Sequence, residues 1–191
     1  MEKPQSSSKS TMKVTSMDRL IKIRKDFIKE RLGSYENQEH NFETVDVVNG
    51  VTYINNSAST DVDSTWLALD KIEKNIIWIV GGVDRGNDYS MLKDLVNDKV
   101  LHIICLGTYI TKIFKAFSQG KSHIIINASS ADEAVHHASL LAKDGDTVLL
   151  SPACASYDLF ESVDDRGLQF KKAVSDLING TLHERYPAKK N

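Results

Sequence analysis

The chain has 191 residues, of which 41% are hydrophobic and 26% are charged, so its composition is that of a globular domain and excludes a wholly disordered chain. Its 24 Lys and Arg residues against 26 Asp and Glu residues give a net charge of −2, which lacks the basic excess of a nucleic-acid or anionic-membrane binder. No apolar run approaches the roughly 18 residues that span a bilayer, and the N-terminus lacks a signal-peptide pattern. We therefore expect a cytoplasmic protein with no membrane and no nucleic-acid partner.

The first part of the chain is predicted to be a flexible tail, residues 1–17, followed by a helix over residues 18–32 that Gly33 stops. Lys and Arg side chains fill the polar positions of this helix, and we read them as a solvated face. An apolar stripe needs cover, so we expect the helix to fold back on the domain, or to pair with a second copy or another protein. The stripe consists of Leu20, Ile23, Phe27 and Ile28.

A β-hairpin is predicted next, because Asn49-Gly50 separates two β-type runs, Thr44–Val48 and Val51–Ile54. Asn and Gly both tolerate the positive φ angles of a tight hairpin turn. A helix is then expected to begin near Ser64.

The remainder alternates apolar runs with helical patterns, which predicts an α/β fold. We expect a Rossmann-like, mostly parallel sheet flanked by helices over residues 40–180, with the hairpin at its N-terminal end and a tail over 181–191. The predicted strands are Ile76–Val80, Val100–Leu106, His123–Ile126 and Thr147–Leu150. The predicted helices are one closed by Gly120, one opened by the capping box at Ser130, and one from about Asp164 that buries Phe170, Val174, Leu177 and Ile178.

Ligands of such sheets bind where the parallel strands end at their carboxyl termini. Three long loops are expected there, Asn55–Asp63, Gly81–Asp88 and Ser151–Arg166, and all are rich in small hydroxyl or charged residues. These loops are the candidate site.

Other chemical motifs are rejected. Gly120-Lys121-Ser122 follows a helix and precedes a strand, the reverse of the order in a P-loop, and the upstream glycine position holds Lys115. The glycines of Gly81–Gly86 do not have the spacing of a dinucleotide-binding loop.

The two cysteines, Cys105 and Cys154, cannot form a disulfide framework, and no set of residues has zinc-ligand spacing. Cys154 could act as a nucleophile with His136 or His137 as its base. We favour a small buried thiol and two histidines on a helix surface.

The three loops together resemble one family. Their sequences are NNSASTD over 55–61, VGGVDRGND over 80–88, and LSPACASYD over 150–158 followed by DRG over 165–167. They resemble the C-terminal domain of the Mur ligases, most closely the D-glutamate-adding members. The resemblance runs from about Asp18 to Leu177, and residues 18–33 resemble the end of the family's central domain.

The resemblance implies a ligase that joins an amino acid to a carboxylate through an acyl phosphate made with ATP and magnesium. The family's P-loop and magnesium ligands belong to its central domain, which this chain does not match. We therefore expect no cofactor or metal of its own for the isolated chain, and no catalysis by it alone.

On the amino-acid side, the resemblance implies that Thr60 and Ser156 contact a ligand carboxylate and that Arg85 replaces a lysine with the same task. The implied ligand is D-glutamate or another small acid. Val163 stands where the family has an aromatic residue. The alternative is that Thr60 and Ser57 cap the helix near Ser64 and that Arg85 is a solvated turn charge.

On the nucleotide side, the resemblance implies a remnant formed by His40, Asn41, Asn56 and Ala58. Asn41 and Ala58 replace an arginine and a lysine of the family, so two positive charges near the nucleotide are lost. Asp61 adds a negative charge there.

Three functions stay open at this point. The chain is the C-terminal domain of a D-glutamate-adding ligase that is inactive alone, or half of a split ligase that works with a separate partner, or a non-catalytic binding or regulatory module. The lost Arg and Lys count against the second.

Overall fold

The computed structural model describes residues 16–32, 38–119 and 123–186. They form an α/β fold around a six-stranded sheet in the order β1-β2-β6-β3-β4-β5, in which only the β1–β2 pair is antiparallel. This confirms the mostly parallel, Rossmann-like sheet. The strands are β1 (Glu43–Val48), β2 (Val51–Asn55), β3 (Ile76–Val80), β4 (Val100–Leu106), β5 (Ile124–Ala128) and β6 (Thr147–Leu150).

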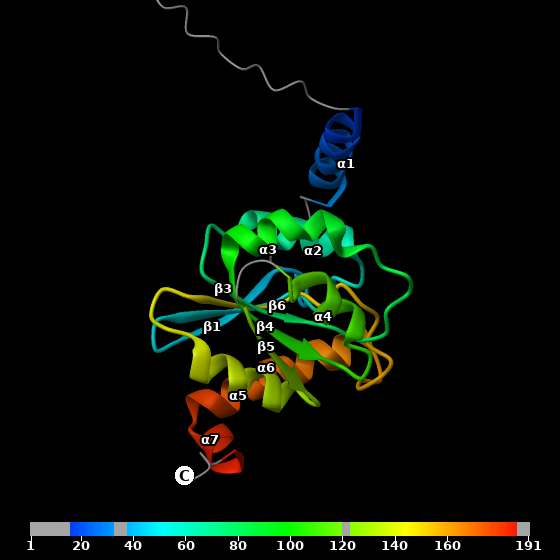
Figure 1. The fold of residues 1–191 in the computed structure, drawn as a ribbon. Coiled ribbons are helices and arrows are strands. Elements are labelled where there is room, and N and C mark those ends of the chain that lie inside the picture. The colour runs from blue at the N-terminus through cyan, green and yellow to red at the C-terminus, as the bar shows by residue number, and fades with distance from the viewer. Residues whose placement is uncertain (1–15, 33–37, 120–122, 187–191) are drawn as a thin grey trace, which may run out of the picture.

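Helices cover both faces of the sheet (Figure 1). On one side lie α2 (Val62–Lys71), α3 (Lys93–Lys99) and α4 (Thr111–Phe117), and on the other α5 (Ala131–Leu141), α6 (Val163–Ile178) and α7 (Thr181–Arg185). A single 3₁₀ turn, η1 (Tyr89–Leu92), precedes α3, and α1 (Ser16–Leu32) stands beyond α2. No described helix is both long and apolar enough to cross a membrane.

Strand β3 shows how the sequence produces two cores. All five of its residues are buried, and alternate side chains point to opposite faces. Trp78 belongs to the cluster under α2 and α3, whereas Ile77 and Ile79 belong to the cluster under α5 and α6. A continuous apolar run is therefore required here, as in other sheets covered on both faces.

The predicted hairpin is confirmed. Asn49 and Gly50 have φ angles of 52° and 78°, and Val48 pairs with Val51 across the turn. The register shifts between Thr44 and Asp46, so one residue of β1 is bulged.

The helix over 18–32 forms, but its stripe is covered only in part. Ile28 is 3% exposed and belongs to the core cluster of α2, whereas Leu20, Ile23 and Phe27 are each more than half exposed. Ion pairs from Arg24 to Asp63 and from Lys29 to Asp70 join α1 to α2 beside Ile28. The helix therefore packs on the domain, but Ile28 is the one residue of the stripe that is buried there. The rest of the contact with α2 is made by the basic side of the helix.

Several other expectations differ from the structure. Ile178, expected in the core, is exposed at the end of α6. Helices η1 and α3 form between Asp88 and Val100, where the sequence pattern predicts no element, and the strand predicted over His123–Ile126 lies one to two residues later, as β5. Within the expected tail over 181–191, α7 forms because Leu182 is fully buried. Residues 1–15 and Gly33 lie outside the described residues.

Candidate functional site

The three candidate loops leave adjacent strands. β6 pairs in parallel with β2 on one side and with β3 on the other, so the carboxyl ends of all three meet at one edge of the sheet. The loop after β2 begins at Asn56, the loop after β3 at Gly81 and the loop after β6 at Ser151. The predicted convergence of the loops is confirmed at the level of the backbone.

Backbone hydrogen bonds fix these loops against one another. Val83 N–H donates to Ala155 O at 2.9 Å and Ala155 N–H donates back to Val83 O at 3.3 Å, which makes a short antiparallel bridge. Gly81 N–H donates to Pro152 O at 3.0 Å. Gly82 lies so close to the bridge that a Cβ there would be 2.2 Å from Ala155 O. The loops after β3 and β6 therefore form one platform.

Asp84 builds the turn that carries Arg85. Its carboxylate accepts the N–H groups of Gly86 and Asn87 at 2.7 and 2.9 Å, and also the Tyr89 hydroxyl and the Lys112 ammonium, each at 3.1 Å. Burial would raise the pKa of Asp84, but these donors outweigh it and hold the pKa below its usual value. The structure leaves Arg85 exposed at the tip of the turn.

Thr60 and Ser156 occupy different surroundings. Thr60 is half-buried and lies just before Asp61, the N-cap of α2, whereas Ser156 is fully buried. Its hydroxyl is among the buried polar atoms that find no hydrogen-bond partner within the described part of the chain. No hydrogen bond joins the side chains of Thr60, Arg85 and Ser156 in that same part, so the structure brings their loops together without joining their side chains.

The helix-cap alternative for Thr60 and Ser57 is wrong. The N-cap of α2 is Asp61, whose carboxylate accepts the N–H of Ser64 at 2.8 Å. Ser57 is buried farther back in the loop, and its hydroxyl also lacks a partner among the described residues. Both hydroxyls are therefore free of a capping role.

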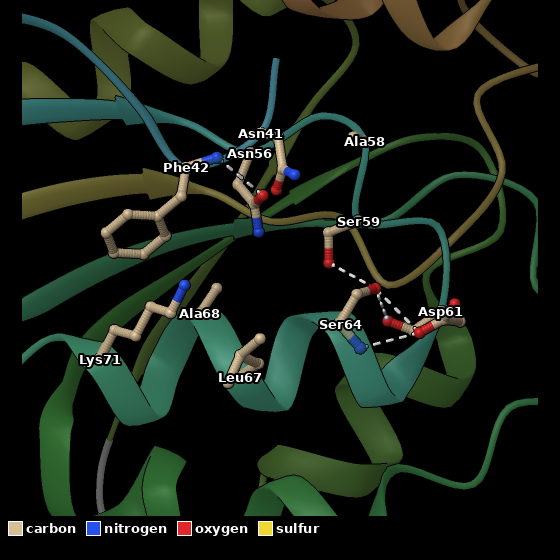
Figure 2. Close-up of a pocket in the computed structure, with 10 residues that line it drawn as sticks. All are labelled: Asn41, Phe42, Asn56, Ala58, Ser59, Asp61, Ser64, Leu67, Ala68 and Lys71. Atoms are coloured by element: carbon tan, nitrogen blue, oxygen red, sulfur yellow. Dashed lines mark hydrogen bonds between the residues drawn. The ribbon is translucent and has the colours of Figure 1, made fainter. Parts of the chain in front are cut away.

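Most of the residues that the resemblance assigns to a nucleotide side line one cavity of about 260 Å³ beside α2. Asn41, Asn56 and Ala58 line it, and Figure 2 shows them across from α2. Asn56 is held in place, because its Oδ1 accepts the Phe42 N–H at 3.0 Å and its Nδ2 donates to Ser151 Oγ at 3.3 Å. His40 does not line the cavity.

His40 is instead a buried structural residue. It is 6% exposed, and its Nδ1 lies 2.9 Å from Asn55 Nδ2. Its backbone has a φ angle of 64° and its N–H donates to Glu43. The remnant therefore divides into a cavity-lining part and a part that supports the loop after β2.

Sequence reasoning missed Phe42 and Lys71, which are among the residues that line this cavity. The Lys71 ammonium lies 5.1 Å from the centre of the Phe42 ring, a cation–π distance. Lys71 lies on the same side of α2 as Ala68 and Ser64, three and seven residues before it, and helical periodicity could have indicated this. Of the residues that line the cavity, Lys71 is the one cation and Asp61 the one acid.

Cys154 is buried, as expected, with its sulfur 3.3 Å from the Tyr89 hydroxyl. Burial raises the pKa of this thiol, which disfavours the nucleophilic thiolate at neutral pH.

The expectation of two surface histidines is wrong for His136, which is buried and stacks on Tyr186 at 5.0 Å between ring centres. Among the residues that the structure places, no group of three or more His, Cys, Asp or Glu side chains is arranged to hold a metal ion.

Comparison with known proteins identifies the family to which this domain belongs. The family model described as the Mur ligase glutamate ligase domain matches residues 41–154, which include all of β1 to β6 and the first part of the loop after β6. The chain belongs to the Mur ligase family. It is homologous to the C-terminal domain of these ligases, as the loop sequences indicated.

Two relatives give the extent of the match. The Mur ligase domain is 46% identical over 170 residues to the UDP-N-acetylmuramoylalanine–D-glutamate ligase of Christiangramia forsetii, covering 89% of this chain and 38% of that protein. It is 47% identical over 155 residues to the protein of the same name from Porphyromonas gingivalis, covering 81% and 34%. The chain thus spans little more than a third of the length of these relatives.

A solved structure agrees with the fold. The murein peptide ligase mpl of Psychrobacter arcticus superposes with a TM-score of 0.51 at 15% identity, covering 74% of this chain and 30% of that one. At this identity the likeness concerns the arrangement of helices and strands alone.

Proposed function

We propose that this Mur ligase domain binds D-glutamate where β2, β6 and β3 end, as the amino-acid-binding part of an ADP-forming ligase reaction of peptidoglycan synthesis. The observation that carries the proposal is the adjacency of these strands, which brings the loops of Thr60, Arg85 and Ser156 to one edge. The relatives in Christiangramia forsetii and Porphyromonas gingivalis are named as ligases of UDP-N-acetylmuramoylalanine and D-glutamate.

The chemistry of the three side chains suits a small dicarboxylic amino acid. Arg85 supplies a charge and a planar fork of donors that fits a carboxylate. Ser156 offers a buried hydroxyl that lacks a partner among the described residues, and a ligand oxygen would satisfy it. Thr60 adds a neutral donor at the start of α2. The open site binds a small ligand weakly, in the millimolar range, because one domain alone covers only one side of it.

Ligand-observed NMR with D-glutamate and L-glutamate tests this proposal on the wild type, on Arg85→Ala and on Lys93→Ala. Lys93 is an exposed lysine of α3 outside the three loops, so its loss matches the charge change without touching the site. We expect D-glutamate to bind the wild type and Lys93→Ala alike, and to bind Arg85→Ala at least about tenfold more weakly. Equal binding by all three proteins would contradict the role of Arg85.

The nucleotide side fits ATP and magnesium poorly. Of the residues lining the cavity beside α2, Lys71 is the one cation, and Asp61 places a carboxylate at the opposite end of the same side of the helix. A triphosphate needs several fixed positive charges. The residues present therefore do not fit the group, and we assign no reaction step to them.

This charge pattern favours a second candidate function, a non-catalytic module that binds an acidic amino acid without the nucleotide. A split ligase that acts with a separate partner is the third. All three functions predict that the 191-residue polypeptide alone releases no phosphate in the presence of the muramoyl-alanine precursor and D-glutamate. Release from it would instead support a working ligase.

A further inference from the structure

Arg166, near the start of α6, is a charged side chain in the interior of the domain, 1% exposed. Its Nη1 donates to Cys154 O at 3.0 Å and its Nη2 to Ser57 O at 2.7 Å. Cys154 lies in the loop after β6 and Ser57 in the loop after β2. One guanidinium therefore joins two of the loops that form the acid site.

The charge of Arg166 is not neutralised within the described part of the chain. No carboxylate there forms an ion pair with it, and its Nε lacks a hydrogen-bond partner there. Asp158 is near enough to interact, but its carboxylate accepts the N–H groups of Thr108 and Leu159. Burial lowers the pKa of Arg166 to about 10, so the side chain still carries its charge at neutral pH. A buried cation without a counter-charge is costly unless something else complements it.

The two loops that Arg166 joins also carry buried hydroxyls without hydrogen-bond partners among the described residues. They are the hydroxyls of Ser57 and Ser156. The start of α6 presses closely on the first of these loops, because a Cβ at Gly167 would lie 2.6 Å from Ser57 Oγ. A buried positive charge and two unused hydroxyls are together what a carboxylate would complement.

We propose that Arg166 is the positioning residue of the acid site: it holds the loop after β2 against the loop after β6, and its charge favours a carboxylate bound at Ser156. The second half of this proposal rests on the proposed function. Because both of its Nη groups donate to backbone carbonyls of the loops, Arg166 does not touch the ligand. It acts through the carbonyls of Ser57 and Cys154 and through its electric field, which acts over a longer range in a poorly solvated interior.

The first experiment needs no ligand. Amide hydrogen exchange is compared in the full chain for wild type, Arg166→Met, Arg166→Lys and the control Lys172→Met, which removes an exposed cation of the same helix. In Arg166→Met we expect exchange at Ser59 and Ala155 to accelerate by about tenfold or more, because both loops lose their common anchor. Arg166→Lys falls in between, and Lys172→Met matches the wild type. Unchanged exchange in Arg166→Met overturns the positioning role.

The second experiment separates charge from structure. D-glutamate is titrated beside D-glutamine and D-isoglutamine, each of which replaces one of its two carboxylates by a neutral amide. In Arg166→Met we expect the preference for D-glutamate over one of these amides to fall by about tenfold, since the cation facing that carboxylate is gone. Arg166→Lys retains the preference. Loss of a merely structural residue would weaken all three ligands by the same factor, and that result overturns the role of the charge.

The two experiments keep this inference apart from the proposed function. If the wild type binds none of the three compounds, the proposed ligand and the role of the charge are both wrong, and exchange still decides whether Arg166 positions the loops. If Arg166→Met does not fold, Arg166→Lys carries the exchange comparison, because it loses the two-pronged contact, and Arg166→Gln carries the ligand comparison, because it removes the charge and keeps a polar donor.

Discussion

The turn around Arg85 depends on a single carboxylate, that of Asp84. Backbone N–H groups, the Tyr89 hydroxyl and the Lys112 ammonium all donate to it. A carboxylate that accepts this many donors is stabilised in its charged form, which is the reason for its lowered pKa. The position of Arg85 therefore depends on the hydrogen bonds that the Asp84 carboxylate accepts.

Replacing Asp84 by Asn removes the charge and should destabilise the domain by about 1–3 kcal/mol at neutral pH. Because the folded pKa of Asp84 is lowered, its contribution is fully present above the unfolded value of about 3.9 and is lost as the pH falls through the folded pKa. Urea unfolding of wild type and Asp84→Asn at a series of pH values measures this. The two stability curves should converge at low pH, and a constant gap would contradict the assignment.

Gly167 shows how tightly α6 approaches the loop after β2. A Cβ at this position would lie 2.2 Å from His40 Nδ1. Alanine favours a helix over glycine by about 1 kcal/mol, but overpacking against a buried ring costs about 1–3 kcal/mol. We expect Gly167→Ala to lower the free energy of unfolding, as measured by urea denaturation. The neighbouring exposed Leu168→Ala should change it by less than about 0.5 kcal/mol, and a more stable Gly167→Ala would show that His40 moves freely.

At the scale of elements, α1 is attached weakly. Ile28 enters the core, Lys25 and Lys29 lie over the Trp66 ring at 5.4 and 5.5 Å, and ion pairs at the surface add little. Pairing of its exposed side with a second copy or another protein stays a prediction, which sedimentation of the chain over a range of concentrations tests.

Ile28→Ala should release α1 without unfolding the sheet, since this side chain supplies the buried apolar contact between the two helices. Limited trypsin digestion then cleaves between Arg19 and Arg31 faster than in the wild type, while the rest of the domain stays intact. Ile23→Ala, more than half exposed, is the matched control and should digest like the wild type. Equal digestion of all three proteins would contradict this account of the attachment.

Strands were easier to predict than helix surfaces, for a physical reason. Ile76–Val80, Val100–Leu106 and Thr147–Leu150 have the predicted bounds because their residues are largely buried and only uninterrupted apolar runs suit that position. Periodicity in α1 indicated a stripe, but which side meets α2 is decided by Trp66 and two ion pairs far away in the sequence.

In the candidate site, too, some features could be predicted from the sequence and others could not. The positions of the three loops could be predicted, because each loop follows a predicted strand of a parallel sheet. The hydrogen bonds of Arg166 and the position of Lys71 against Phe42 depend on contacts between segments distant in the sequence. No local pattern contains such contacts. His40 illustrates this too, since the resemblance indicated a nucleotide-side residue and the packing of Asn55 and Gly167 makes it part of the interior.

At the scale of the whole molecule, the charges divide the site into two sides. Asn41 and Ala58 line the cavity beside α2, which is the nucleotide side that the resemblance implies. The wild type should bind ATP more weakly than millimolar, because two charge-assisted contacts of about 1.5–3 kcal/mol each are missing. In the double variant Asn41→Arg/Ala58→Lys, calorimetry should show tighter ATP binding, and micromolar affinity in the wild type would contradict the proposal.

The central claim is that the loops after β2, β3 and β6 form one site for an acidic amino acid. Protein-observed NMR tests it most directly, by titrating D-glutamate into the isotope-labelled chain and mapping the amide shifts. The account predicts saturable shifts in the millimolar range that cluster near Thr60, Arg85 and Ser156 and are absent in Arg85→Ala. A well-dispersed spectrum of folded protein that does not change at tens of millimolar D-glutamate, or shifts confined to other surfaces, would contradict it.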